Sequence, residues 1–137
     1  NFIGKQSVKK KISLTDWVYE SIKKDKMMLG YNNIFFNPLN VSTLLKYLYI
    51  IIEKKNMKGI FNLGSRGYLS KYELIKIFLK KAKKKKLVKS IVYKKTSLKA
   101  KRSLNMVMSV KKIEKHLNIK LPSTRNEINK TLREYYL

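Results

Sequence analysis

The sequence contains no cysteine, which excludes disulfide bonds and thiolate metal ligands. It contains one histidine, His116, so a histidine-based metal centre is not expected. The longest apolar stretch, Leu44 to Ile52, contains Lys46 and is far shorter than the ~20 residues of a membrane helix. The first residues also lack the apolar segment of a signal peptide. These absences predict a cytoplasmic protein that has no resident metal and makes no membrane contact.

Acidic residues are scarce, because 8 Asp and Glu stand against 33 Lys and Arg, giving a net charge of +25. Such a charge is typical of nucleic-acid-binding proteins. However, 29 of the basic residues are Lys and only 4 are Arg, whereas bidentate contacts to phosphates and bases favour Arg. The chain is also rich in Asn, Ile, Tyr and Phe, which share AT-rich codons with Lys. Genome composition therefore explains the charge better than a nucleic-acid partner, which remains the alternative.

Hydrophobic residues make up 44% of the 137 residues, enough for the core of one domain. Apolar periodicity and capping residues predict strands that alternate with helices, which is an α/β arrangement. We predict helices over residues 16–28, 43–55, 71–86, 109–117 and after Pro122, and strands over residues 33–36, 59–64, 87–93 and 106–108.

Several helix ends carry specific signals. Ser70-Lys-Tyr-Glu73 is a capping box, Gly30 is expected to end the first helix, and Asn118 the fourth. Ser42 or Thr43 is expected to cap the helix over residues 43–55, and Ser123 or Thr124 the last helix. The helix over residues 43–55 is apolar on nearly every side, so we expect it to show an exposed apolar face. Since the strands are also too few for a self-sufficient parallel sheet, residues 1–137 form a single partial domain.

No group of residues points to catalysis within this chain. Tyr-x-x-x-Lys occurs at Tyr19 and at Tyr72, but the composition alone predicts about 1.5 such matches, so neither is assigned a role. The turn at residues 64–67 lacks the Gly-x-Gly-x-x-Gly spacing of a phosphate loop and is interpreted as a plain turn. The eight carboxylates show no paired spacing.

The last third of the chain carries a family resemblance. Ala100-Lys-Arg102-Ser-Leu-Asn105, followed by Lys112 and by Leu121-Pro122, resembles the carboxyl-terminal signature of dTDP-4-dehydrorhamnose reductases, which are extended short-chain dehydrogenases/reductases. The segments at residues 1–4, 37–39, 59–64 and 70–73 are similar to that family in the same order. Two departures, Ser103 in place of the usual Pro and Asn37 before Pro38, leave related sugar-nucleotide epimerases and dehydratases open.

The resemblance implies the carboxyl-terminal, substrate-binding lobe of a Rossmann-type extended short-chain dehydrogenase, helix-rich with a few short strands. The amino-terminal dinucleotide-binding domain, with its cofactor loop and catalytic Tyr and Lys, is expected to be missing. The intact enzyme is expected to use NADPH or NADH to act on a nucleotide-activated 4-keto sugar, and this chain alone is expected to bind no cofactor. A homo-oligomer is compatible with this interpretation.

The resemblance also suggests three substrate-binding residues. Arg102 is expected to hold the diphosphate, because a guanidinium can bind phosphate oxygens in a bidentate manner. Asn105 is a candidate for a polar contact to the sugar or nucleotide. Asn1 is a candidate substrate-binding residue because its position in the chain could bring it near the site in the intact enzyme. The plainer alternatives are an exposed basic loop residue for Arg102 and a strand-end hydrogen bond to the backbone for Asn105.

Overall fold

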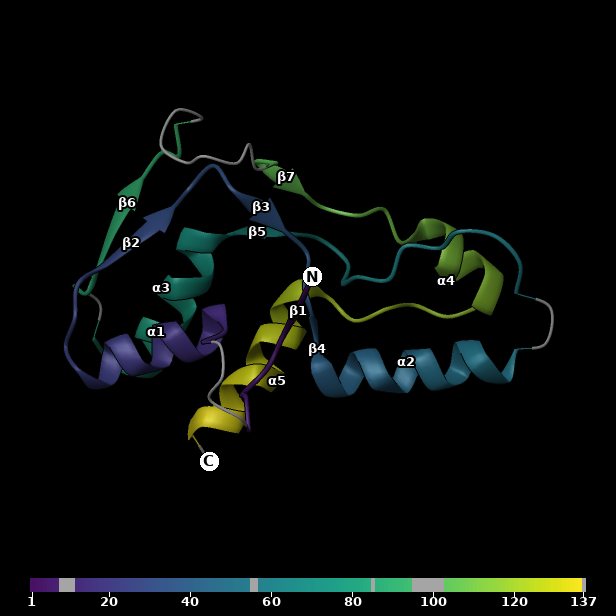
Figure 1. Ribbon diagram of the computed structural model, residues 1–137, viewed down its shortest axis with the longest axis horizontal. Helices are drawn as coiled ribbons and strands as arrows, with labels where there is room; N and C mark the ends of the chain where they lie inside the picture. The colour runs from purple at the N-terminus through teal and green to yellow at the C-terminus, as the bar shows by residue number, and fades with distance from the viewer. Residues whose placement is uncertain (8–11, 55–56, 85, 95–102, 137) are drawn as a thin grey trace.

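The computed structural model describes residues 1–7, 12–54, 57–84, 86–94 and 103–136, and shows a helix-rich α/β arrangement with short strands, as predicted (Figure 1). The described elements are, in chain order, β1 (Phe2–Ile3), α1 (Leu14–Lys23), β2 (Met28–Tyr31), β3 (Phe35–Phe36), β4 (Leu39–Asn40), α2 (Val41–Glu53), β5 (Leu69–Ser70), α3 (Lys71–Lys81), β6 (Val88–Ile91), β7 (Asn105–Met106), α4 (Lys111–Leu117) and α5 (Thr124–Tyr136).

The described strands form three small sheets. β1 pairs with β4 and β2 pairs with β6, both in parallel. In the third sheet β3 is central, antiparallel to β5 and parallel to β7, so that Phe35 is opposite both Ser70 and Asn105. Figure 1 shows α1, α3 and α5 on one side of the β2–β6 and β3–β5–β7 strands, while α2 and α4 extend away from them.

The first helix is shorter than predicted, and the prediction that it reaches Met28 is wrong. It ends at Lys23, and Asp25 then adopts a left-handed conformation with φ of 49°. Met28–Tyr31 is the strand β2, held by β6 nearly sixty residues later. Gly30 does not end a helix: a Cβ there would lie 2.9 Å from Cδ2 of Tyr72 in α3, so glycine permits the close packing of strand on helix.

Residues 59–64 are predicted to form a strand, but the structure shows no strand over these residues, so this prediction is wrong. Phe61 and Leu63 instead pack, half-buried, against a small hydrophobic cluster. The other local signals hold. The Ser70 capping box of α3 is present, Asn118 adopts the left-handed conformation (φ of 52°), and Ser123 rather than Thr124 caps α5 by accepting from the backbone N–H of Asn126.

The start of α2 is anchored by Asn40, not by Ser42 or Thr43 as predicted. Its side-chain oxygen accepts a hydrogen bond from the backbone N–H of Ser42 at 3.0 Å, which makes it the helix cap. Its amide nitrogen donates to Thr131 Oγ1 (2.9 Å) and Glu134 Oε1 (2.6 Å) of α5. Its backbone N–H donates to Glu127 Oε2 at 2.7 Å. One fully buried residue therefore joins α2 to α5.

Two hydrophobic clusters form the core. The large cluster gathers side chains of α1, β2, α3 and α5, including Val18, Met28, Phe78 and Ile128. The small cluster consists of the residues Val110, Ile113, Leu117 and Leu121, against which Tyr47, Ile50 and Ile51 of α2 pack.

The opposite side of α2 is exposed and apolar, which confirms the expectation for this helix. Its exposed side chains range from 39% to 77% exposure. We call this set the outer stripe of α2; it comprises Val41, Leu45, Leu48, Tyr49 and Ile52.

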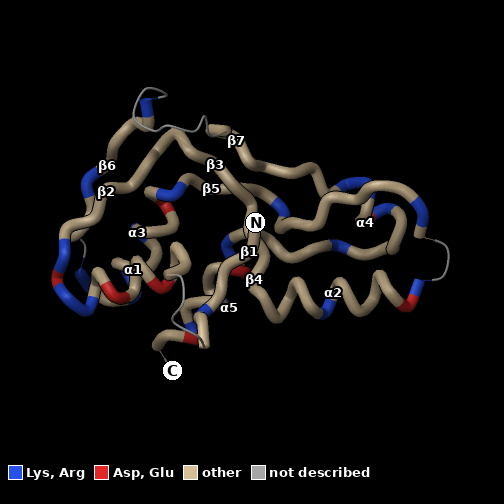
Figure 2. The backbone as a smooth tube through the Cα atoms, in the orientation of Figure 1, with Lys and Arg blue, Asp and Glu red and all other residues tan. Residues whose placement is uncertain are grey.

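Charge is distributed widely over the described residues. Figure 2 shows Lys and Arg from one end of the molecule to the other rather than gathered over one group of elements. None of the helices in the described part of the chain is long and apolar enough to cross a bilayer.

Candidate functional site

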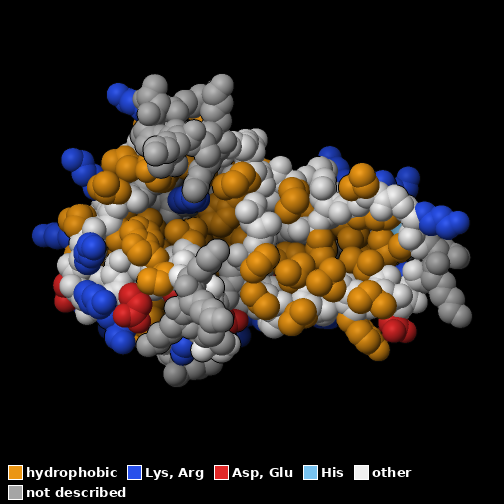
Figure 3. All heavy atoms as spheres, viewed as in Figure 1, with side chains coloured by type: hydrophobic (Ala, Val, Ile, Leu, Met, Phe, Trp, Pro, Cys, Tyr) orange, Lys and Arg blue, Asp and Glu red, His pale blue; other side chains and the backbone are white. Residues whose placement is uncertain are grey.

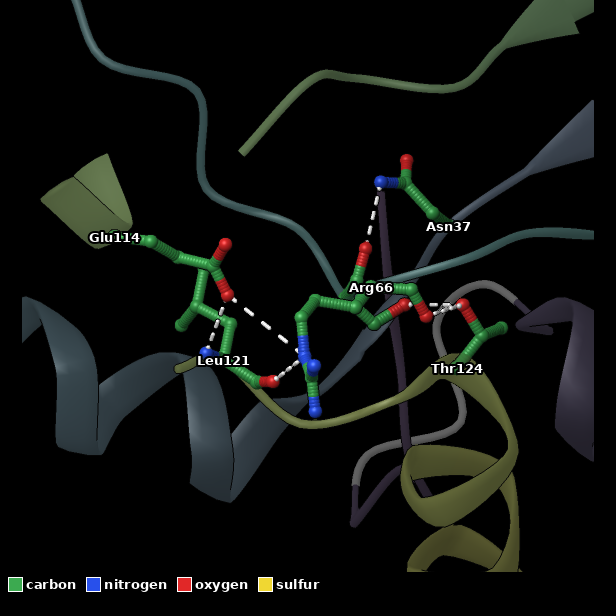
Figure 4. Close-up of polar contacts among 6 residues, drawn as sticks. Asn37, Arg66, Glu114, Leu121 and Thr124 are labelled. Carbon is green, nitrogen blue, oxygen red and sulfur yellow. Dashed lines mark hydrogen bonds and ion pairs between the residues drawn. The ribbon is translucent and has the colours of Figure 1, made fainter. Parts of the chain in front are cut away.

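Asn37, directly after β3, is the centre of a buried polar network (Figure 4). Its side-chain nitrogen donates to the carbonyls of Ser65 and Met108, each at 2.9 Å. Its side-chain oxygen accepts from the N–H of Met108, also at 2.9 Å. Gly64 allows this approach, since a Cβ there would lie 3.0 Å from the Asn37 nitrogen. One side chain thus fastens the ends of β3 and β7 to the loop before β5.

The same loop is tied to the start of α5 and to α4. Thr124 donates to the Arg66 carbonyl from its backbone N–H (2.8 Å) and its hydroxyl (3.0 Å). The Arg66 Nε–H donates to the carbonyl of Leu121 at 2.5 Å, and it lies 3.8 Å from Glu114 Oε1. Glu114 in turn accepts from the N–H of Leu121 at 2.7 Å. These bonds fix the connection from α4 to α5.

In the turn at residues 64–67, the backbone N–H groups of Ser65 and Arg66 are occupied. The N–H of Ser65 donates to the Asn37 carbonyl at 3.2 Å, and the N–H of Arg66 donates to the Pro122 carbonyl at 2.8 Å. A phosphate-binding loop requires such N–H groups to point at the ligand. These two N–H groups therefore do not point at a ligand, which makes the turn a poor phosphate-binding loop.

The structure brings two of the three predicted substrate-binding residues to one corner. The side-chain nitrogen of Asn1 donates to the carbonyl of Met106 at 3.3 Å, next to Asn105 in β7. The side-chain oxygen of Asn105 accepts from the N–H of Val107 at 3.0 Å, which is the strand-end bond of the plainer alternative. Arg102 lies outside the described residues, immediately before Ser103. All three assignments remain predictions.

An aromatic pair, not singled out in the sequence, lies on the same sheet as Asn105. The rings of Phe35 and Tyr68 meet edge to face with 5.7 Å between centroids, and Tyr68 is exposed. Because Phe35 is opposite Asn105 in the parallel ladder, their side chains emerge from the same face of this sheet. Only the pairing of β3 with β7 reveals this juxtaposition, so no local sequence signal could have indicated it.

The two Tyr-x-x-x-Lys pairs fold as ordinary contacts on helix surfaces. Lys23 Nζ lies 5.7 Å from the ring centre of Tyr19, and Lys76 Nζ lies 5.4 Å from that of Tyr72. Both are cation–π contacts across one helical turn. No group of three or more potential metal-ligating side chains occurs among the residues that the structure describes.

Comparison with known families gives one match, to the RmlD substrate binding domain, over residues 7–137. The chain belongs to this family. The resemblance to extended short-chain dehydrogenases of the dTDP-4-dehydrorhamnose reductase type is thereby confirmed. A search of curated proteins gives no match.

Solved structures share the fold. The dTDP-4-dehydrorhamnose reductase of Bacillus anthracis, in complex with NADP, matches with a TM-score of 0.83 and 15% identity, over 97% of this chain and 46% of that chain. The reductase of Yersinia enterocolitica matches with a TM-score of 0.82 and 14% identity, over 98% and 47%. The dTDP-glucose 4,6-dehydratase of Bacillus anthracis, in complex with NAD, matches with a TM-score of 0.76 and 12% identity, over 99% and 42%.

The fold is therefore that of the substrate-binding part of extended short-chain dehydrogenases, as predicted. The chain spans less than half the length of the structures that it matches.

Proposed function

We propose that this chain is the substrate-binding part of an NAD(P)-dependent oxidoreductase that acts on a nucleotide-activated 4-keto sugar. The family match over nearly the whole chain is the observation that carries the proposal. Hydride transfer and the binding of NADPH or NADH belong, in this proposal, to a dinucleotide-binding part. No step of the reaction is assigned to residues of this chain, since its one glycine-rich turn is a poor phosphate-binding loop.

The corner formed by Asn1 and β7 supports the proposal. Asn105 can offer its amide nitrogen to a hydroxyl or carbonyl of the ligand while its oxygen holds the backbone of Val107. Phe35 and Tyr68 add an aromatic surface, of the kind on which nucleotide bases stack. Arg102 precedes this corner in sequence by three residues, and we assign it the diphosphate.

A titration of the complete natural polypeptide that carries this sequence, with dTDP as the probe, tests the proposal. Arg102→Ala should weaken dTDP binding roughly tenfold or more, because a charge-assisted bidentate contact is lost. Arg133→Ala removes an exposed guanidinium on α5 and should leave the affinity unchanged. Binding of single-stranded DNA that persists in moderate salt, together with no binding of dTDP, would favour the nucleic-acid alternative and refute the proposal.

A second candidate activity, epimerisation or dehydration, is favoured by the likeness to the dTDP-glucose 4,6-dehydratase fold. The two activities differ in cofactor stoichiometry. A reductase consumes one NAD(P)H for each sugar nucleotide converted, whereas an epimerase or dehydratase returns its cofactor to the starting state. Absorbance at the nicotinamide band during turnover distinguishes them. We place either enzyme in the cytoplasm, because proteins of that compartment rarely contain disulfide bonds and this chain has no cysteine to form one.

A further inference from the structure

The helix α5 carries its acidic side chains and one of its arginines on opposite sides. Glu127 and Glu134, seven residues apart, lie on the side that faces Asn40, from which both accept hydrogen bonds. Asn129 and Arg133, four residues apart, share the other side of the helix. The negative charge of α5 is therefore engaged by bonds within the chain, away from Arg133.

A cavity of about 260 Å³ lies where the ends of α3 and α5 meet. It is lined by one residue from the last turn of α3, Lys81, and by four residues of α5: Asn129, Leu132, Arg133 and Tyr136. The polar groups of these described lining residues are two cations, an amide and a phenol, with no carboxylate among them. Lysine and arginine side chains only donate hydrogen bonds. The cavity is thus suited to a ligand that brings negative charge and acceptor oxygens.

The two cations of the cavity come from different helices and have no acidic partner. On the face that Figure 3 shows, Lys and Arg side chains lie mostly apart from one another around the margin. At the cavity, by contrast, Lys81 and Arg133 line the same space. Neither of them forms an ion pair with an acidic residue in the described part of the chain. Their charges are therefore available to an anion.

The hydroxyl of Tyr136 is a second, independent sign of a ligand. It is buried, yet it has no hydrogen-bond partner among the residues that the structure describes. Buried polar groups are nearly always paired, because an unpaired one costs free energy. Burial raises the pKa of Tyr136 above its ordinary value, which keeps the hydroxyl protonated as a donor. One cavity thus joins two unpaired cations to a residue whose hydroxyl lacks an acceptor.

The helix ends alone do not account for this arrangement. A cation in the last turn of a helix stabilises that end, and this explains Lys81 or Arg133 taken separately. It does not explain the unpaired hydroxyl of Tyr136, which gains nothing from the helix dipole. A ligand with several acceptor oxygens accounts for all three groups.

Charge and size indicate which anion fits. A phosphate monoester carries nearly two negative charges at neutral pH and three strong acceptor oxygens, which match two cations and further donors. A carboxylate brings one charge. Pockets for drug-sized ligands have volumes of about 300–1,000 Å³. A cavity of about 260 Å³ therefore takes a molecule smaller than a nucleotide sugar.

We propose that the cavity between the ends of α3 and α5 binds the phosphate group of a small phosphomonoester, at a site separate from that of the nucleotide sugar. Lys81 and Arg133 neutralise the phosphate from two helices, and the amide of Asn129 donates to it. The hydroxyl of Tyr136 donates to it after a small rotation of the ring. The bound phosphate joins α3 to α5 at their carboxyl ends and so stabilises the folded chain.

A titration followed by phosphorus NMR tests the site on the complete natural polypeptide that carries this sequence. The probes are inorganic phosphate and glycerol 3-phosphate, at constant ionic strength. Arg133→Ala should weaken the binding of both probes roughly tenfold or more, because a charge-assisted contact is lost. Tyr136→Phe, which removes only the hydroxyl, should weaken it roughly threefold to tenfold.

Arg125→Ala is the matched control, since it removes the same charged group from α5 about 12 Å away from Arg133 along the helix axis. It should leave the affinity for both probes unchanged. Equal weakening by Arg125→Ala and Arg133→Ala would mean that phosphate responds only to the net charge, and it would overturn the proposal. Unchanged affinity in Tyr136→Phe would overturn the role of the hydroxyl.

Two variants separate this site from that of the proposed function. Because dTDP exceeds the cavity in size, Arg133→Ala should weaken glycerol 3-phosphate binding and leave dTDP binding unchanged. Arg102→Ala should do the reverse. Binding of glycerol 3-phosphate that depends on Arg133, together with no dTDP binding, would refute the proposed function and support the phosphate site. Loss of both affinities in Arg133→Ala would overturn the separation of the two sites.

Discussion

The two hydrophobic clusters differ in how completely this chain encloses them. The large cluster is surrounded by α1, α3, α5 and the β2–β6 sheet, so Leu74 and Phe78 are fully buried. The small cluster is a thin layer between α4 and α2, and α2 contributes half-buried residues to it while its other side is bare. A helix can therefore be well formed and capped while one apolar side of it remains exposed. The described residues enclose the first region on all sides, whereas in the second region one side of α2 stays exposed.

The largest effect should come from truncating matched leucines in the two clusters. Leu74 and Leu121 are both fully buried. Leu74→Ala should lower the free energy of unfolding by about 3–5 kcal/mol, because the enclosed cluster cannot collapse into the cavity. Leu121→Ala should cost about 2–3 kcal/mol, since the thin cluster can relax. Urea unfolding of both variants gives the comparison, and equal losses would show that the two clusters are equally rigid.

The polar network of Asn37 links the two regions and should be nearly as sensitive. Asn37→Ala leaves two carbonyls and one N–H without their bonds, so we expect a loss of about 2–4 kcal/mol in the free energy of unfolding. Asn129→Ala, an exposed change on α5, should alter stability by less than about 0.5 kcal/mol. A small effect at Asn37 would mean that water replaces the lost amide.

The large cluster should also lose stability at alkaline pH through Tyr135. Burial, followed by its hydrogen bond to Asp16 (2.6 Å), raises the pKa of Tyr135 well above the ordinary 10.0. The unfolded state loses this proton first, so stability is complete below pH 10 and falls as pH rises towards the folded pKa. Tyr135→Phe should cost about 1–2 kcal/mol at pH 7 and make the fall above pH 10 shallower. Parallel curves for both proteins, measured by thermal unfolding, would contradict this assignment.

The smallest effect is expected on the outer stripe of α2. Leu45→Gln and Ile52→Gln should change the free energy of unfolding of residues 1–137 by less than about 0.5 kcal/mol, since both side chains are already in water. Ile113→Ala in the small cluster, by contrast, should cost about 2–3 kcal/mol, as for Leu121. Urea unfolding of the three variants tests whether α2 is bare on one side. A loss at Ile52 comparable to that at Ile113 would indicate that the stripe is covered within this chain.

Signals that act within a few residues could be predicted from the sequence. The capping box of Ser70 and the left-handed Asn118 depend on neighbouring backbone only, and both were identified correctly. The exposed face of α2 followed from a helix that is apolar on nearly every side. The fold and family followed from the ordered segments that the family comparison then matched.

Features that depend on distant pairing could not be predicted. β2 exists because of β6, and Gly30 is required by Tyr72 of α3, neither of which is visible near residue 30. From the sequence, Asn37 only marks the end of the strand over residues 33–36. Its side-chain hydrogen bonds to the carbonyls of Ser65 and Met108 could not be predicted, because both partners are distant in sequence. The juxtaposition of Phe35 with Asn105 likewise needs the register of β3 with β7. The positions of the helices could therefore be predicted from the sequence better than the geometry of the candidate site.

The bonds of Asn40 have a mechanical consequence. α2 is 13 residues long, which corresponds to a rod of about 20 Å held at one end by Asn40 and its partners on α5. A rotation of only about 10° at that root would displace the far tip, near Ile52, by about 3.5 Å, the diameter of a methyl group. The short hydrogen bonds of Asn40 thus set the direction of α2. A small change of angle at Asn40 becomes a much larger displacement of the side chains near Ile52.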